Sequence, residues 1–368
     1  DYFVSKRITG QGRLIAVLSD GLGSGIKANI LACLTATMLL RFVEEEREIG
    51  EAAEIVLNSL PVCRVRRISY ATFSAVEADE EGHVRVVEEG NPDFLWLRGD
   101  QLRKSGYNVV ISKSFPDRRM KVYQFQVNLG DRLIFCSDGV TQAGLGRPGR
   151  WHSGLQREGL VEMLRLVLKN RPDISSSDLA RYIVRRAQAV DWDGLARDDI
   201  SAAVIYFRTP RQAMVFTGAP FDESRDALYA RVLERFEGRK AICGGTTAQL
   251  LSRELGRPLT MREYPSGGNL PPISEMPGID LITEGAVTLS RTLEYLERNE
   301  KEGPGRDGRL MEFFLKSDVI HFMVGSRLNP ANYDPAQPLE LDIRRNIINR
   351  LAEVLQSKYL KKIIVRHF

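Results

Sequence analysis

Two segments of the chain share a pattern in which an apolar run ends on an Asp-Gly pair. Residues 13–18 lead into Asp20-Gly21, and residues 132–136 lead into Asp138-Gly139. A third acidic site, Asp198, opens the apolar run over residues 200–207. An aspartate at the end of a buried strand is held rigidly with its carboxylate toward a cleft. The following glycine lets the backbone turn sharply, so that its carbonyl oxygen can reach a ligand.

Carboxylates that converge without a counter-charge repel each other, so a cluster of them is costly unless a cation neutralises it. A donor set of hard oxygens with no histidine or cysteine selects Mg²⁺ or Mn²⁺ rather than zinc. Two such ions can activate a bridging water and clamp a phosphoryl group for in-line attack. A single Asp-Gly after a strand is also an ordinary turn signal. The prediction of a dinuclear centre therefore rests on the ordered set.

The elements that must position these aspartates can be read from the apolar patterns of the first half. In the first helix, Ile30, Leu34, Met38 and Phe42 recur every four positions and predict an apolar stripe. Meandering strands with paired helices predict a two-layer sheet core flanked by helices. We expect strands at 13–18, 70–76, 84–88, 94–97, 121–127, 132–136 and 200–207, and helices at 26–46, 51–60, 159–169 and 177–189.

Four motifs in this order resemble those of the type 2C, metal-dependent protein serine/threonine phosphatases, in particular the bacterial sporulation stage II and stress-response branch. The motifs are Asp1-Tyr2-Phe3, Ser19-Asp20-Gly21-Leu22-Gly23-Ser24-Gly25, Ser137-Asp138-Gly139-Val140 and Asp198-Asp199-Ile200-Ser201. The resemblance covers residues 1–207, and Ser201 departs from it because many relatives carry threonine there. It implies a phosphatase-like β-sandwich flanked by helices.

The resemblance also implies roles for individual residues. Asp20 would bridge two Mn²⁺ or Mg²⁺ ions, and the carbonyl of Gly21 would bind the first of them. Asp138 and Asp198 would bind the second ion, and Asp1 would act through metal-bound water. The catalytic set is then Asp20, Asp138 and Asp198. The implied substrate is phosphoserine or phosphothreonine on a small regulatory protein, such as an anti-sigma-factor antagonist.

A dinucleotide-binding interpretation of the glycines after Asp20 fails on two counts. That fingerprint needs glycine at the sixth position of the motif, where Ile26 stands. An aspartate directly before the glycines would also repel a pyrophosphate.

Beyond a linker at residues 209–212, strands and helices alternate regularly, which predicts a second α/β domain with a mostly parallel sheet. The domains are expected at 1–208, a metal-dependent phosphatase domain, and 212–368, a regulatory or ligand-binding domain. Strands are expected at 213–216, 241–243, 279–282, 319–324 and 363–365, helices at 223–236, 247–255, 286–298 and 341–355, and a flexible loop at 303–308.

The second domain carries a candidate anion site between a strand and a helix, formed by Gly244, Gly245, Thr246 and Thr247. Backbone N–H groups at a helix start can bind an anion, but capping turns explain the same residues equally well. No Gly-Lys-Ser/Thr follows, so the segment is not a P-loop. The loop at 265–269 could close over a cleft. Ligand sensing and dimerisation both remain open for this domain.

The bulk composition excludes several other classes of function. Hydrophobic residues make up 43% and charged residues 27%, with a net charge of +4, which is ordinary for a globular protein and too near balance for nucleic acid binding. The scattered cysteines and histidines give no zinc spacing and fit a reducing cytosol. No run in this segment predicts a membrane span. Alternative functions are a catalytically weak module that docks a phosphoprotein, and a hydrolase of a small phosphoester.

Overall fold

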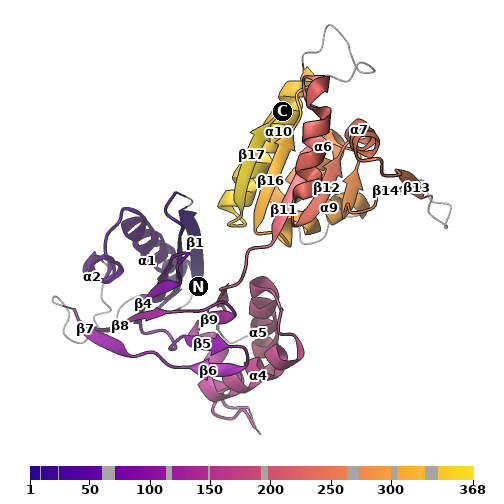
Figure 1. Ribbon diagram of the computed structural model, residues 1–368. Coiled ribbons are helices and arrows are strands. Elements are labelled where there is room, and N and C mark those ends of the chain that lie inside the picture. Colours follow the sequence, from indigo (N-terminus) through magenta and orange to yellow (C-terminus); the bar gives the residue numbers. More distant parts are fainter. Residues whose placement is uncertain are drawn as a thin grey trace. The chain divides into compact units, whose positions relative to one another are not determined.

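Figure 1 shows the computed structural model of the chain. The structure describes residues 1–8, 10–23, 25–59, 71–112, 118–147, 150–191, 198–262, 273–299, 305–327 and 339–368. The chain divides into two units, Asp1–Thr209 and Pro210–Phe368, and each is described by itself.

The first unit contains two antiparallel sheets. The larger has the strand order β1-β2-β3-β4-β8-β7 and the smaller the order β10-β9-β5-β6. The strands are β1 (Tyr2–Ile8), β2 (Arg13–Gly21), β3 (Ala71–Ala78), β4 (His83–Glu89), β5 (Leu95–Arg98), β6 (Gln101–Arg103), β7 (Tyr107–Ile111), β8 (Arg119–Gln126), β9 (Asp131–Cys136) and β10 (Ala202–Tyr206).

The two sheets pack face to face around one apolar core. Leu18 and Val86 of the larger sheet share this core with Trp96 and Phe135 of the smaller one. On the outer faces, α1 (Ile26–Glu44) and α2 (Ile49–Ser59) cover the larger sheet. Helices α4 (Gln156–Asn170) and α5 (Ser176–Val190) cover the smaller one, and the short α3 (Asp138–Thr141) follows β9. The predicted β-sandwich flanked by helices is confirmed.

Helix α1 buries a different face from the one that the sequence predicts. Ile30 and Leu34 are 55% and 47% exposed, whereas Ala32, Ala36 and Leu39 are fully buried. The helix is apolar on most sides, so the four-residue period alone does not decide which side packs. The small alanines let the helix approach the sheet closely, while Ile30 and Leu34 remain on the exposed side.

Among the described residues, α1 is also the helix whose length and apolar composition would suffice to cross a membrane. Of this stretch, 39% is buried inside the first unit. The buried part includes Leu39, Leu40 and Val43, which belong to the core between α1, α2 and the larger sheet.

Three strands of the first unit have no counterpart in the sequence prediction: β1, β6 and β7. Strand β1 pairs with β2 along its length, from Tyr2 opposite Ser19 to Ile8 opposite Arg13. Strand β7 forms the edge of the larger sheet, and all five of its residues are exposed. Its Tyr-Asn-Val-Val-Ile sequence has no alternation of apolar and polar residues, so the pattern on which strand prediction depends is missing.

The second unit is built on a parallel sheet with the strand order β15-β12-β11-β16-β17. Its strands are β11 (Gln212–Thr217), β12 (Arg239–Cys243), β15 (Leu281–Thr283), β16 (Val319–Val324) and β17 (Lys362–His367). A separate antiparallel pair consists of β13 (Thr260–Arg262) and β14 (Ile273–Glu275). The predicted parallel sheet is confirmed. Its order reverses between β11 and β16, the place where α/β sheets of this kind usually bind ligands.

Helices cover both faces of this sheet. One face carries α6 (Asp226–Arg235), which follows the short η2 (Glu223–Arg225), and α7 (Gly245–Leu255). The other carries α8 (Ala286–Glu297), α9 (Gly305–Leu315) and α10 (Leu339–Ser357).

The flexible loop expected at residues 303–308 is partly wrong, because α9 already begins at Gly305. Burial of Phe313 and Phe314 in the sheet core outweighs the poor helix propensity of the glycines. The loop expected at 265–269 lies outside the described residues.

Candidate metal centre

Strand pairing brings the predicted acidic residues to one edge of the sandwich. In the larger sheet Tyr2 lies opposite Ser19, so Asp1 and Asp20 are at the same end of adjacent strands. In the smaller sheet Cys136 lies opposite Ala202, so Asp138 and the segment before β10 meet in the same way. The backbone nitrogen of Asp1 lies 2.7 Å from the Asp199 carboxylate, so the two strand ends meet.

The carboxyl groups perturb one another. Burial, followed by the negative charge of Asp138, raises the pKa of Asp20 from 3.8 to about 6, and Asp198 adds to this while the chain's amino group opposes it. Burial and then the charge of Asp198 also raise the pKa of Asp138. Asp20 and Asp138 are within hydrogen-bonding range of each other. Such mutual repulsion is what a bound cation would relieve.

Several carboxylate oxygens at this edge are buried and have no hydrogen-bond partner. These atoms are the two side-chain oxygens of Asp1 and the Oδ1 atom of Asp138. The side chain of Asp1 is only 6% exposed. A buried, unpaired carboxylate is costly, and an oxygen-only donor set suits Mn²⁺ or Mg²⁺. The residues present therefore fit such an ion.

The glycines of both Asp-Gly pairs are needed for close backbone approach. A Cβ on Gly21 would lie 2.0 Å from the carbonyl oxygen of Ala28, and one on Gly139 would lie 2.2 Å from that of Asp199. Neither glycine adopts a positive φ. The sequence interpretation, in which glycine permits a sharp turn, therefore needs correction. At Gly21 the start of α1 leaves no room for a side chain, and at Gly139 the segment before β10 leaves none.

Asp198 and Asp199 differ in what they contact. The Oδ1 atom of Asp198 accepts a hydrogen bond of 2.8 Å from the N–H of Asp199, and the residue is exposed. The Asp199 carboxylate lies beside the backbone nitrogen of Asp1, as described above, and its carbonyl accepts a 3.1 Å hydrogen bond from the Ser137 hydroxyl. This structural role of Asp199 has no local sequence signal, because its partners lie far away in the chain.

A buried polar network lies beside the Asp20 strand end and was not expected from the sequence. Thr72, which pairs with Asp20 across the sheet, donates a hydrogen bond to Asn91. Asn91 in turn donates to Ser74, which donates to Glu88. Burial, with a smaller contribution from Asp93, raises the pKa of Glu88 to about 8. Glu88 is therefore protonated at neutral pH.

A comparison with known protein families assigns the chain to one of them. A sequence model of the Stage II sporulation protein E (SpoIIE) family matches residues 10–208. The chain belongs to the SpoIIE family. The resemblance to type 2C phosphatases is thereby confirmed. No curated protein sequence matches the chain.

Several solved structures are similar to this SpoIIE-family chain. The RsbU and RsbW domains of a Mycobacterium tuberculosis protein share 17% identity, with a TM-score of 0.46 over 64% of this chain and 62% of that one. The phosphatase domain and regulatory fragment of Bacillus subtilis SpoIIE share 18%, with a TM-score of 0.45 over 55% and 57%. The SiaA phosphatase domain of Pseudomonas aeruginosa shares 15%, with a TM-score of 0.43 over 56% and 80%. The match thus covers about three fifths of the length of the first two of these proteins.

A second acidic group in the SpoIIE-family unit lies in the turn between β3 and β4. Asp79, Glu81 and His83 place their ligand atoms within 4.8 Å of one another. The Asp79 carboxylate accepts hydrogen bonds from the backbone N–H of His83 (2.8 Å) and lies 2.9 Å from its ring Nδ1. These contacts are those of an ordinary exposed turn. None of the three belongs to the acidic set at the sandwich edge.

In the second unit, the predicted anion-site residues stand at the start of α7. Gly244 is the N-cap residue of α7, and no side chain caps this helix start with a hydrogen bond. Gly245 and Thr246 are exposed. The Thr247 hydroxyl is already used, because it accepts a 3.0 Å hydrogen bond from the N–H of Gly218. A Cβ on Gly285, the N-cap of α8, would lie 3.2 Å from the Cα of Gly244, so two helix starts converge here.

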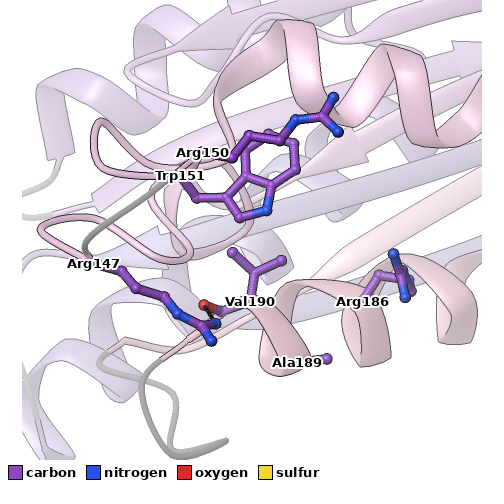
Figure 2. A pocket seen from close by; sticks show the side chains of 6 residues that line it. All are labelled: Arg147, Arg150, Trp151, Arg186, Ala189 and Val190. Carbon is purple, nitrogen blue, oxygen red and sulfur yellow. Dashed lines mark hydrogen bonds between the residues drawn. The ribbon is translucent and has the colours of Figure 1, made fainter.

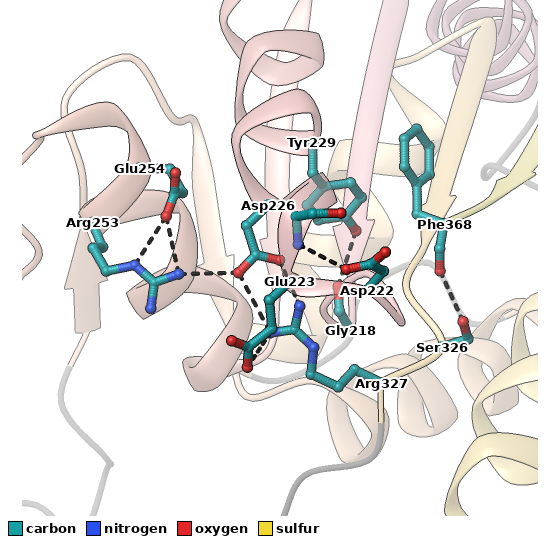
Figure 3. Close-up of polar contacts among 11 residues, drawn as sticks. Gly218, Asp222, Glu223, Asp226, Tyr229, Arg253, Glu254, Ser326, Arg327 and Phe368 are labelled. Atoms are coloured by element: carbon teal, nitrogen blue, oxygen red, sulfur yellow. Dashed lines mark hydrogen bonds and ion pairs between the residues drawn. The ribbon is translucent and has the colours of Figure 1, made fainter.

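Figure 3 shows a charged cluster beyond the ends of β11 and β16 that the sequence analysis missed. Asp226, whose side chain is only 4% exposed, pairs with Arg327 at 2.7 Å and Arg253 at 3.0 Å. The Tyr229 hydroxyl lies 3.0 Å from the carbonyl of Gly218 and 2.8 Å from that of Met323, so it ties the two strand ends together. Within the fold these groups pair with one another, although the Nε atom of Arg327 is buried without a hydrogen-bond partner.

Proposed function

We propose that the first unit hydrolyses phosphoserine or phosphothreonine esters in a regulatory phosphoprotein, with two Mn²⁺ or Mg²⁺ ions held at the sandwich edge. The observation that carries the proposal is the set of unpaired, buried oxygens of Asp1 and Asp138 beside Asp20, whose pKa is raised. Membership in a family of type 2C phosphatases supports the choice of reaction.

In this proposal Asp20, the Gly21 carbonyl, Asp138 and Asp198 would hold the two ions, and Asp1 would act through metal-bound water. Bound ions would lower the pKa of a water and neutralise charge on the phosphoryl oxygens. The chain's own contribution is to hold the carboxylates together at one edge of the sandwich. Thr72 and Asn91 fix the strand end that carries Asp20.

The test is release of phosphate from a serine-phosphorylated peptide with Mn²⁺, with Mg²⁺ and with chelator. We expect metal-dependent turnover that is lost in Asp20→Asn and Asp138→Asn and retained in Asp100→Asn, a change in the turn between β5 and β6. Turnover that survives in the first two variants would remove the site assignment. No turnover with either metal would favour the alternative, a module that docks a phosphoprotein without hydrolysing it.

A protein substrate is favoured over a small phosphoester because the neighbouring structures include regulatory phosphatases. An anti-sigma-factor antagonist is the partner that the family resemblance suggests, in the cytoplasm. A comparison of turnover of a phosphopeptide and p-nitrophenyl phosphate distinguishes the two: a higher kcat/KM for the small ester would support the small-ester hydrolase instead.

For the second unit we propose a regulatory, ligand-binding role, at Gly244, Gly245, Thr246 and Thr247 near the reversal of strand order. The convergence of the α7 and α8 starts supports this, since free helix N–H groups favour anions. Inorganic phosphate and pyrophosphate should raise the melting temperature of the second unit, and Gly245→Pro should abolish the effect. No shift with either anion would favour dimerisation as the role of this unit, which sedimentation then measures.

A further inference from the structure

The loop after α3 and the C-terminal end of α5 form an open surface cavity of about 350 Å³ in the first unit (Figure 2). It is lined by Arg147, Arg150, Trp151, Arg186, Ala189 and Val190. Three of these side chains are cationic and none is acidic. A volume of this size is in the range of small-ligand or side-chain pockets.

The three arginines differ in how strongly they are already engaged. Arg147 donates a 2.8 Å hydrogen bond to the carbonyl of Val190 and so caps the end of α5. Arg150 lies over the ring of Trp151, 4.6 Å from its centroid, and pairs with Glu162. That ion pair is exposed on both sides, at 64% and 65%, and exposed pairs are weak.

Arg186 is the arginine whose guanidinium donors are not used by the described part of the chain. It is exposed and makes no hydrogen bond or ion pair with any described part of the chain. In Figure 2 its guanidinium and that of Arg147 lie on opposite sides of Val190, and the Trp151 indole lies above Val190 beside Arg150. Cations gathered around an apolar platform create a positive potential that an anion would neutralise.

The cavity belongs to the same chain segments as the proposed metal ligands. The N–H of Gly144 donates a 2.7 Å hydrogen bond to Asp191, which joins the segment after Asp138 to the segment before Asp198. Along the sequence, Arg147 follows Asp138 by nine residues (147 − 138) and Val190 precedes Asp198 by eight (198 − 190). The segments that line the cavity are therefore continuous along the chain with those that carry Asp138 and Asp198, and the Gly144–Asp191 hydrogen bond holds these two segments together.

We propose that this cavity binds a carboxylate side chain of the phosphoprotein substrate, so that the unit selects phosphorylated sites with acidic neighbours. The inference rests on the proposed function. Arginine forks match carboxylates bidentately, and a flat indole beneath them accommodates the aliphatic part of an Asp or Glu side chain. A small phosphoester has no such neighbour and gains nothing from the cavity.

The test compares Arg186→Ala with Arg185→Ala, the adjacent and equally exposed arginine of α5 that does not line the cavity. Substrates are two serine-phosphorylated peptides, one with Asp and Glu beside the phosphoserine and one with Asn and Gln, together with p-nitrophenyl phosphate. Loss of one exposed charge-assisted contact should raise KM for the acidic peptide about threefold to fivefold. The kcat should stay unchanged, as should all constants for the neutral peptide and the ester.

Equal effects of the two substitutions, or equal effects on both peptides, would overturn the inference. A binding measurement separates its failure from that of the proposed function. A fluorescein-labelled acidic peptide without phosphate is titrated with the full chain in chelator, and its anisotropy is recorded.

We expect the labelled peptide to bind wild type and Arg185→Ala equally and Arg186→Ala about threefold to fivefold more weakly. If this difference in binding is found but the protein releases no phosphate with either metal, the inference about the cavity is supported and the phosphatase proposal is wrong. Turnover with no difference in binding between the variants would refute the cavity alone.

Discussion

Replacement of Asp138 by Asn should change the stability of the first unit in opposite directions with and without metal. In the metal-free protein the pKa of Asp20 is about 6 instead of 3.8. A native pKa above the unfolded value adds stability below pH 3.8, and this stability is lost as the pH rises through about 6. At pH 7.5 both carboxylates are charged and the full repulsion is present.

The magnitude follows from the size of the shift. The difference of 2.2 units (6 − 3.8) corresponds to about 3 kcal/mol. Because Asp20 is only half-buried, solvent screening reduces this to about 1.5 kcal/mol. Burial is the larger cause and Asp138 the second, so the substitution should recover only part of this, less than about 1 kcal/mol. Wild type with Mn²⁺ at a hundredfold excess over Kd should gain about 2.7 kcal/mol, which the variant lacks.

Tryptophan fluorescence during urea unfolding measures this effect in the first unit alone, because all three tryptophans, Trp96, Trp151 and Trp192, precede residue 209. Wild type, Asp138→Asn and the control Asp100→Asn are compared in chelator and in Mn²⁺. A variant that is less stable than wild type in chelator, or one that Mn²⁺ stabilises as fully as wild type, would refute the reasoning.

Three further predictions concern other parts of the first unit. Glu88→Gln should remove a loss of stability that wild type shows as the pH rises from 4.5 through about 8, on the order of 5 kcal/mol in total for a pKa difference of 3.5 units (8 − 4.5). Equal urea midpoints for both proteins at pH 6.5 and at pH 9 would contradict this prediction. Gly139→Ala puts a Cβ 2.2 Å from a carbonyl oxygen and should cost about 2–3 kcal/mol and abolish stabilisation by Mn²⁺. Gly106→Ala, with nothing within 4 Å, should do neither. Leu34→Ser should change the unfolding free energy by less than about 0.5 kcal/mol, whereas Leu39→Ala should cost about 2–5 kcal/mol; similar losses would show that α1 packs on the face that the sequence predicts.

Features that depend on local sequence were predicted well. Asp20 and Asp138 each follow an apolar run of strand length, so both strands and both acidic ends could be recognised without knowing the partners. The parallel sheet of the second unit was predicted for the same reason, because alternation of strands and helices is a local pattern. In β16, the predicted residues 319–324 coincide with Val319–Val324.

Features that depend on contacts between distant residues were not predicted. The pairing of Asp1 with Asp199 spans 198 positions, and no local pattern announces it. The buried face of α1 depends on how closely β2 lets the helix approach, which the period of apolar residues does not specify. In the same way, α9 begins among glycines because Phe313 and Phe314 gain more from burial than the glycines lose.

The order of strand pairing has a consequence for when the acidic site comes into being during folding. Strands β1 and β2 are joined by a short turn and can pair early, but β10 pairs with β9 only after the intervening α4 and α5 have folded back. Closing so long a loop is among the slow steps of folding. On the ribosome, residue 198 must also have emerged before the ligand set is complete. Under the proposed function, an ion that requires Asp1, Asp20, Asp138 and Asp198 together would bind only after β9 and β10 have paired, late in the folding of the unit.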